Sequence, residues 1–303
     1  MLDRMTTGGA APRLMLPLLF VLIYGSGFVG AKLGLLYSEP FTFLLWRFML
    51  AGGLLLVAAY LLDAAMPSNV GWLILSGLLM QGVFSAGLFY AVYLGMKPAV
   101  SALIIALQPL LVTVLAGFYL SEKVTTQRWL GLLIGVTGVM LVVIDGLTTE
   151  GNNWINISCA VIALLGLSLG QLVQKKHCSD MNLISGGAVQ VLSTIPPLFL
   201  LSWLFESGEL IWHLELVISM FWMAVGVSIG ALSLLYIMIQ QNSASQVASV
   251  FYGIPVAAAL VAWPLFDQIP TLADWFGFSI VVLGVWVANS TFSIKVRLPL
   301  RNL

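Results

Sequence analysis

The chain has 303 residues, of which 60% are hydrophobic and only 8% are charged. A soluble domain carries about 25% charged residues, so this composition excludes an ordinary soluble protein and indicates an integral membrane protein. Twelve basic residues balance twelve acidic ones, and this balance gives no sign of nucleic acid as a partner.

Apolar runs of about 20 residues, the length that crosses the hydrocarbon core of a bilayer, recur along the whole chain. The first run continues to Leu36, which favours a membrane helix over a cleaved signal. The sequence therefore predicts an all-α membrane protein with ten transmembrane helices, near 14–36, 40–62, 71–95, 99–120, 127–146, 153–174, 183–205, 217–239, 244–266 and 272–294.

Basic residues fall mainly on one side of this topology. With the N-terminus inside, nine Lys and Arg residues lie on the cytoplasmic side, and only Lys32 and Lys97 lie outside. This excess predicts a multi-pass protein of the cell inner membrane with both termini in the cytoplasm. Cys159 and Cys178 are not expected to form a disulfide framework, since they lie in or beside a span on the reducing side.

The chain is a duplication. A displacement of 146 positions places Tyr90 on Tyr236, Pro109 on Pro255 and Trp129 on Trp275, and one of 143 places Arg47 on Gln190. We therefore expect two repeats, 1–148 and 149–303. Each holds five spans, an odd number, so the second repeat enters the membrane with the opposite orientation. Inverted repeats are typical of secondary transporters, which place the substrate near the midplane between them.

Three segments resemble a known family: "YGSGFVGAK" (24–32), "EPFTFLLWR" (39–47) and the long stretch from Pro98 to Leu141. They are similar to the EamA family of the drug/metabolite transporter superfamily, and the resemblance runs over nearly the whole chain. It implies a carrier for small metabolites, often an exporter of amino acids. It also implies that spans one to four and six to nine surround the cavity while spans five and ten pack outside.

Arg47 lies among apolar residues in the second span. An arginine within a membrane should face the bundle interior or water. Two interpretations stay open: it binds an anionic group of the substrate, such as a carboxylate, or it satisfies helix carbonyls or reaches the outer interface. Lys32 likewise either guides anions at the outer mouth or extends to the interface.

Hydroxyl, amide and aromatic side chains share helix faces on several spans and suit a zwitterionic or weakly polar solute. Interhelical hydrogen bonding is the alternative for each of them. The candidate substrate-binding residues are Tyr24, Phe28, Arg47, Tyr90, Tyr93, Gln108, Gln171, Gln190, Tyr236, Gln240 and Tyr252. Pro109 and Pro255 occupy matching mid-span positions and are candidate hinges, with static kinks as the alternative.

No catalytic constellation is expected, because His177 and His213 fall on opposite sides of the membrane. No metal site and no cofactor are predicted either. Every carboxylate lies at a helix end, which favours facilitated diffusion or exchange over proton coupling, although Glu39 or Asp267 could carry protons at the outer mouth. We interpret Glu122 with Lys123 as a surface ion pair that anchors a loop.

The sequence thus predicts a secondary transporter that exports amino acids or similar amphipathic solutes and works by alternating access. Its expected partners are a small-molecule solute and the lipid bilayer, and it is expected to be a monomer or homodimer. The alternatives are a non-transporting membrane assembly or scaffold protein and a flippase for lipid-linked substrates.

Overall fold

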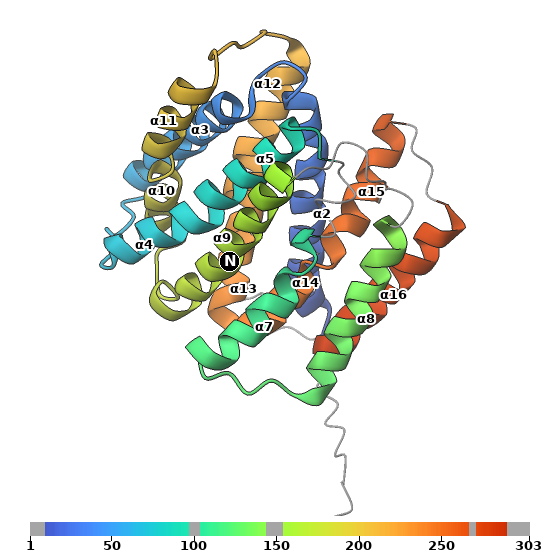
Figure 1. The fold of residues 1–303 in the computed structure, drawn as a ribbon. Coiled ribbons are helices and arrows are strands. Elements are labelled where there is room, and N and C mark those ends of the chain that lie inside the picture. Colours follow the sequence, from blue (N-terminus) through green and yellow to red (C-terminus); the bar gives the residue numbers. More distant parts are fainter. Residues whose placement is uncertain (1–9, 97–103, 144–153, 267–270, 290–303) are drawn as a thin grey trace, which may run out of the picture.

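A computed structural model describes residues 10–96, 104–143, 154–266 and 271–289 as a bundle of helices (Figure 1). The described part contains eight helical segments that are long and apolar enough to cross a membrane, and a shorter apolar helix over Gln108–Tyr119. The prediction of a multi-pass helical membrane protein is therefore confirmed, whereas the number of ten spans stays a prediction.

The first half of the chain supplies α2 (Ala10–Gly34), α3 (Pro40–Leu61), the continuous series α4 (Val70–Gly77), η1 (Leu78–Val83) and α5 (Phe84–Tyr93), then α7 (Gln108–Tyr119) and α8 (Thr126–Val143). The second half supplies α9 (Trp154–His177), α10 (Leu183–Leu192) with α11 (Ile195–Phe205), the series α12 (Leu214–Phe221), η3 (Trp222–Ala231) and α13 (Leu232–Gln241), α14 (Ala244–Val250) with α15 (Gly253–Phe266), and α16 (Leu272–Asn289).

Helices of the two halves pack against each other in pairs. α3 lies against α10 and α11, α5 against α9, and α2 against α15 and η3. The shared core contains large apolar side chains from both halves, among them Phe43, Phe48, Leu167 and Leu235. The two halves therefore form one bundle and bury one main core between them.

α8 and α16 lie side by side at one edge of the bundle (Figure 1). Glycines allow their backbones to touch, since a Cβ atom built on Gly131 would lie 2.3 Å from the Ala288 nitrogen, and one on Gly284 would lie 2.5 Å from the Gly135 nitrogen. Close contact through small residues is a common means of helix association in membranes. This placement matches the one that the resemblance implies for spans five and ten.

Two π-helical segments, η1 and η3, occupy matching places in the two halves, starting at Leu78 and Trp222. A π-helix is rare and often marks a functional position. No pattern in the sequence predicted these segments. Gln81 lies in η1 and Ser228 in η3, so both irregular segments carry a buried polar side chain into the bundle.

The spans that contain Pro109 and Pro255 are broken just before each proline. α7 begins at Gln108 after a turn at 106–107, and α15 begins at Gly253 after a turn at Phe251 and Tyr252. These breaks are the kind of irregularity that the prolines predict. Their role as hinges stays a prediction.

Candidate functional site

Arg47 lies on the buried face of α3 with 5% of its surface exposed. Its Nε donates a hydrogen bond of 2.9 Å to the Ser228 hydroxyl in η3, and its guanidinium lies 4.9 Å from the centre of the Phe48 ring. It forms no ion pair with any carboxylate in the described part of the chain. The side chain is thus buried inside the bundle, where it joins α3 of the first half to η3 of the second half.

Aromatic residues of α2 and of the turn between α14 and α15 surround the neighbouring space. Tyr24 is 9% exposed and interacts electrostatically with Arg47. Its ring lies 5.2 Å from that of Phe20 and 5.9 Å from that of Phe251, while Phe28 is half-buried against the same core. Two predicted residues, Tyr24 and Arg47, are therefore neighbours.

Tyr236 is 2% exposed and accepts a hydrogen bond of 3.2 Å from Nε2 of Gln81. Tyr236 and Tyr24 belong to the same core cluster, which connects this pair to the surroundings of Arg47. Gln81 was missed by the sequence analysis. Its signal was a single amide in an otherwise apolar stretch, "GLLMQGV".

A second polar cluster is built from glutamines. Gln108 donates to Gln171 over 2.6 Å, and Gln171 donates to the Ala244 carbonyl over 3.0 Å. Gln190 donates to Gln174 over 2.6 Å, and the Ser76 hydroxyl donates to the same Gln174 oxygen over 2.8 Å. The four glutamine side chains are fully buried, and their bonds join α4, α7, α9, α10 and α14.

Three buried amide oxygens have no hydrogen-bond donor among the described residues: Oε1 of Gln81, Gln108 and Gln190. Leaving a buried acceptor unpaired costs about 1 to 3 kcal/mol. These three interior amide oxygens could therefore accept hydrogen bonds from a bound solute.

The other predicted site residues lie elsewhere. Tyr90 stacks on Phe41 at 5.0 Å, whereas Tyr93 is 53% exposed. Gln240 donates to the Met181 carbonyl near the end of α13. Tyr252 belongs to a separate cluster beside α8 and α16, where its ring packs against Gly135. The eleven predicted residues therefore do not form one pocket.

Glu122 corrects the expectation of a surface pair with Lys123. Its carboxylate accepts hydrogen bonds from the Ala244 nitrogen at 2.7 Å, from the Ser245 nitrogen at 3.4 Å and from the Ser245 hydroxyl at 2.9 Å. It has no ion pair with Lys123 in the described residues. The first turn of a helix offers unpaired N–H groups, and these donors outcompete a solvated lysine for the carboxylate.

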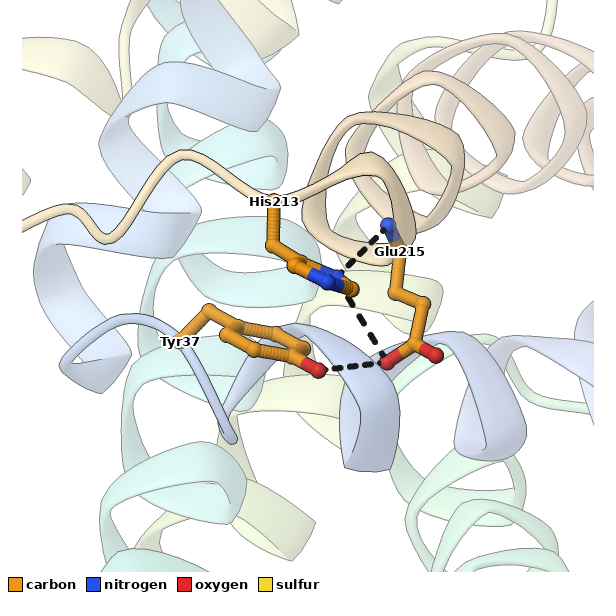
Figure 2. A network of polar contacts seen from close by, with 3 residues as sticks. All are labelled: Tyr37, His213 and Glu215. Atoms are coloured by element: carbon orange, nitrogen blue, oxygen red, sulfur yellow. Dashed lines mark hydrogen bonds and ion pairs between the residues drawn. The ribbon is translucent and has the colours of Figure 1, made fainter.

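At the opposite end of the bundle, the connector before α3 meets the connector before α12. Glu206 accepts from the Phe41 nitrogen at 2.6 Å, from the Thr42 nitrogen at 2.7 Å and from the Thr42 hydroxyl at 2.7 Å. Figure 2 shows a second link at this end: the Tyr37 hydroxyl donates to Glu215 over 2.6 Å, and the Tyr37 ring stacks on His213 at 4.8 Å. Glu206 was not among the residues selected from the sequence.

An apolar groove lies on the outside of the bundle, beside the helix that carries Arg47. Its volume is about 330 Å³. The residues that line it are Trp46, Met49, Leu50, Trp212, Val217, Met220 and Phe221. Since Trp212 is 66% exposed and Phe221 57% exposed, the groove opens on the outer surface of the bundle.

Comparison with known proteins places this architecture in a family. Residues 12–144 and 154–290 each match the EamA-like transporter family. The chain is 26% identical to an uncharacterized transporter of Bacillus subtilis, YvbV, with 89% of both chains covered. It is 22% identical to a probable amino-acid metabolite efflux pump of Escherichia coli, with 93% of this chain and 96% of the relative covered.

The fold is also found among solved structures. One crystal structure superposes with a TM-score of 0.77 at 18% identity, covering 91% of this chain and 96% of the other. The two matched halves, the apolar helices and the relatives named as transporters agree with one another. This chain therefore belongs to the EamA-like transporter family and is a membrane transporter of small solutes.

Proposed function

We propose that the protein exports amino acids or similar amphipathic solutes by alternating access, and that Arg47 binds the carboxylate of the solute. The observation that carries this proposal is a buried guanidinium whose only hydrogen bond in the described residues uses Nε. A charge inside a membrane costs at least about 2.5 kcal/mol on insertion scales. A carboxylate bound to the remaining N–H groups would offset that cost with paired, charge-assisted bonds.

The surroundings of Arg47 suit an amphipathic solute. Tyr24, Phe251 and Phe28 offer aromatic surface, and Gln81 offers an amide oxygen without a donor. An ammonium or amide group could use such an acceptor. The Escherichia coli relative is named as an amino-acid metabolite efflux pump, which agrees with this solute class.

Alternating access rests on the duplicated sequence. We propose that 1–148 and 149–303 are inverted repeats, that there are ten spans, and that the solute binds between the repeats. The excess of Lys and Arg assigns the end of the bundle at Glu122 to the cytoplasm and the end at Glu206 to the outside of the inner membrane.

The experiment is uptake and counterflow of a labelled amino-acid panel in proteoliposomes, with and without a pH gradient. Arg47→Gln removes the charge, and Arg47→Lys keeps the charge without the planar fork. Losing a charge-assisted contact of about 1.5 to 3 kcal/mol should raise KM about 10- to 100-fold. Lys123→Gln, in an exposed connector, is the control. Saturable flux that survives Arg47→Gln unchanged would refute the assignment of Arg47.

A flippase for lipid-linked substrates is the second candidate, and the lipid-facing groove beside Trp46 favours it. Bleaching of fluorescent lipids by an impermeant reductant measures scrambling in the same proteoliposomes. Scrambling without solute flux would replace the exporter by the flippase. The absence of both activities would favour the scaffold protein.

A further inference from the structure

Two carboxylates, one from each half of the sequence, hold helices of the opposite half at opposite ends of the bundle. Glu206, in the connector between α11 and α12, binds the first turn of α3. Glu122, in the connector between α7 and α8, binds the first turn of α14. The two contacts thus have the same design with the roles of the halves exchanged.

We propose that these contacts are two clamps, the Glu206 clamp and the Glu122 clamp, and that each must open for solute to enter or leave at its own end. This inference rests on the alternating access proposed above. Both clamps are formed in this structure.

The donors explain why each clamp is needed only when its end is closed. Phe41 and Thr42 are 5% and 2% exposed, and Ala244 and Ser245 are fully buried. The first N–H groups of a helix have no partner within the helix. In a closed end these groups are shielded from water and depend on the carboxylate, whereas in an open end water can replace it.

Both contacts lie where the halves would have to separate. The Thr42 hydroxyl is also 2.8 Å from the Ser202 hydroxyl, so the Glu206 clamp continues inward as a second bond between α3 and α11. Beside this clamp, the Glu39 carboxylate accepts hydrogen bonds from the Ser207 and Gly208 nitrogens in the connector that carries Glu206. On the other end, Arg128 donates to Ser245 over 2.7 Å.

The charges around the two clamps differ. Glu122 interacts electrostatically with Arg128 and Lys175, both cationic. The charged neighbour that acts on Glu206 is Glu39, which repels it. The Glu122 clamp is therefore held by opposite charges and the Glu206 clamp is not, so we expect the Glu206 end to open more readily.

The test measures access to buried cysteines without any substrate. In a background in which Cys159 and Cys178 are replaced by alanine, Ser202→Cys reports on the Glu206 end and Ser249→Cys on the Glu122 end; both serines are buried. Purified protein in lipid nanodiscs, open to solution at both ends, is labelled with a polar maleimide. Thermal denaturation of each variant checks that it is folded.

Glu206→Ala leaves three donors unpaired in the closed end, so labelling at Ser202→Cys should rise about five-fold or more. Because opening of one end requires closure of the other, labelling at Ser249→Cys should fall in the same variant. Glu122→Ala should produce the reverse pattern. Glu209→Gln and Asp180→Asn, which remove exposed carboxylates at the two ends, should change neither rate.

Either of two results overturns the proposal: no change at the near reporter, or a rise at both reporters, which indicates general loosening. The outcome is separate from that of the transport assay. Reciprocal labelling without flux of any solute would support the clamps and contradict the exporter. Saturable flux with unchanged labelling would support the exporter and contradict the clamps.

Discussion

Gln190 offers a test in which stability and function should move in different directions. Its Nε2 donates to Gln174 over 2.6 Å, but its Oε1 is buried without a donor among the described residues. Gln190→Leu removes that unpaired oxygen, a gain of about 1 to 3 kcal/mol, and loses one hydrogen bond of about 0.5 to 1.5 kcal/mol. The net change should lie between about 0.5 kcal/mol of destabilisation and about 2.5 kcal/mol of stabilisation, because Gln174 keeps the Ser76 hydroxyl.

Gln174→Leu is the matched variant, with the same change of side chain in the same cluster. It leaves the Gln190 amide nitrogen without its acceptor and the Ser76 hydroxyl with only the Met80 sulfur at 3.7 Å. One buried donor without a partner and one with only a weak acceptor should together cost about 2 kcal/mol or more. The two leucine variants should therefore differ in sign or by several kcal/mol.

Thermal denaturation in detergent, followed by tryptophan fluorescence, measures this difference, and 1 kcal/mol corresponds to about 2 °C for a chain of this size. If the Gln190 oxygen serves the solute, Gln190→Leu should lose flux while its Tm is kept or raised. Equal losses of Tm in Gln190→Leu and Gln174→Leu would refute the reasoning, since they would show that Gln190 contributes to the fold as much as Gln174 does.

Three further predictions concern packing, pH and thiol chemistry. Gly284→Ala places a Cβ 2.5 Å from the Gly135 nitrogen and should cost about 1 to 3 kcal/mol of stability by overpacking. In Gly53→Ala the new Cβ has nothing within 4 Å, so this variant should gain about 0.5 to 1 kcal/mol. Equal Tm values for the two variants would contradict this prediction. Desolvation, and to a lesser extent the Glu39 carboxylate, raise the pKa of Glu206, although hydrogen bonds from Phe41 and Thr42 oppose the shift. The closed Glu206 clamp therefore binds a proton more readily than the open one, so closure is favoured in acid and is lost as the pH rises through the raised pKa. Labelling of Ser202→Cys should increase with pH, and the increase should exceed the one measured in the Glu206→Gln variant, which reports the ionisation of the thiol alone. Stronger labelling in acid would overturn this sign. Burial raises the pKa of Cys178 to about 11, so a maleimide at neutral pH should modify Cys178 far more slowly than a cysteine placed in the exposed connector by Asp180→Cys.

Much of the fold could be predicted because composition and periodicity act along the whole chain. The apolar runs predicted membrane helices, and the repeated Pro109 and Pro255 predicted irregular spans. Arg47 was selected because placing a charged side chain in the membrane costs free energy, and a charge in an apolar run is visible without any knowledge of its neighbours. These are properties of single segments.

The polar contacts between distant segments could not be predicted in the same way. Glu206 and Glu122 look like ordinary connector residues, and only the packing of the halves brings them to Phe41 and Ala244. Tyr252 was selected as a substrate-binding residue, but the turn at Phe251 and Tyr252 interrupts the helix, and the Tyr252 ring packs against Gly135. An apolar sequence also fits a π-helix as well as an α-helix, so η1 and η3 left no pattern.

The two π-helical segments determine how their spans would respond to a change in length. An α-helix advances about 100° per residue and bonds residue i to i+4, whereas a π-helix bonds i to i+5 and so holds one residue more in each turn. Deleting one residue within 78–83 would therefore allow a regular α-helix while Tyr90 keeps nearly its present direction. A change of length by one residue in this segment would alter the backbone of one turn and leave the facing of the later side chains almost unchanged.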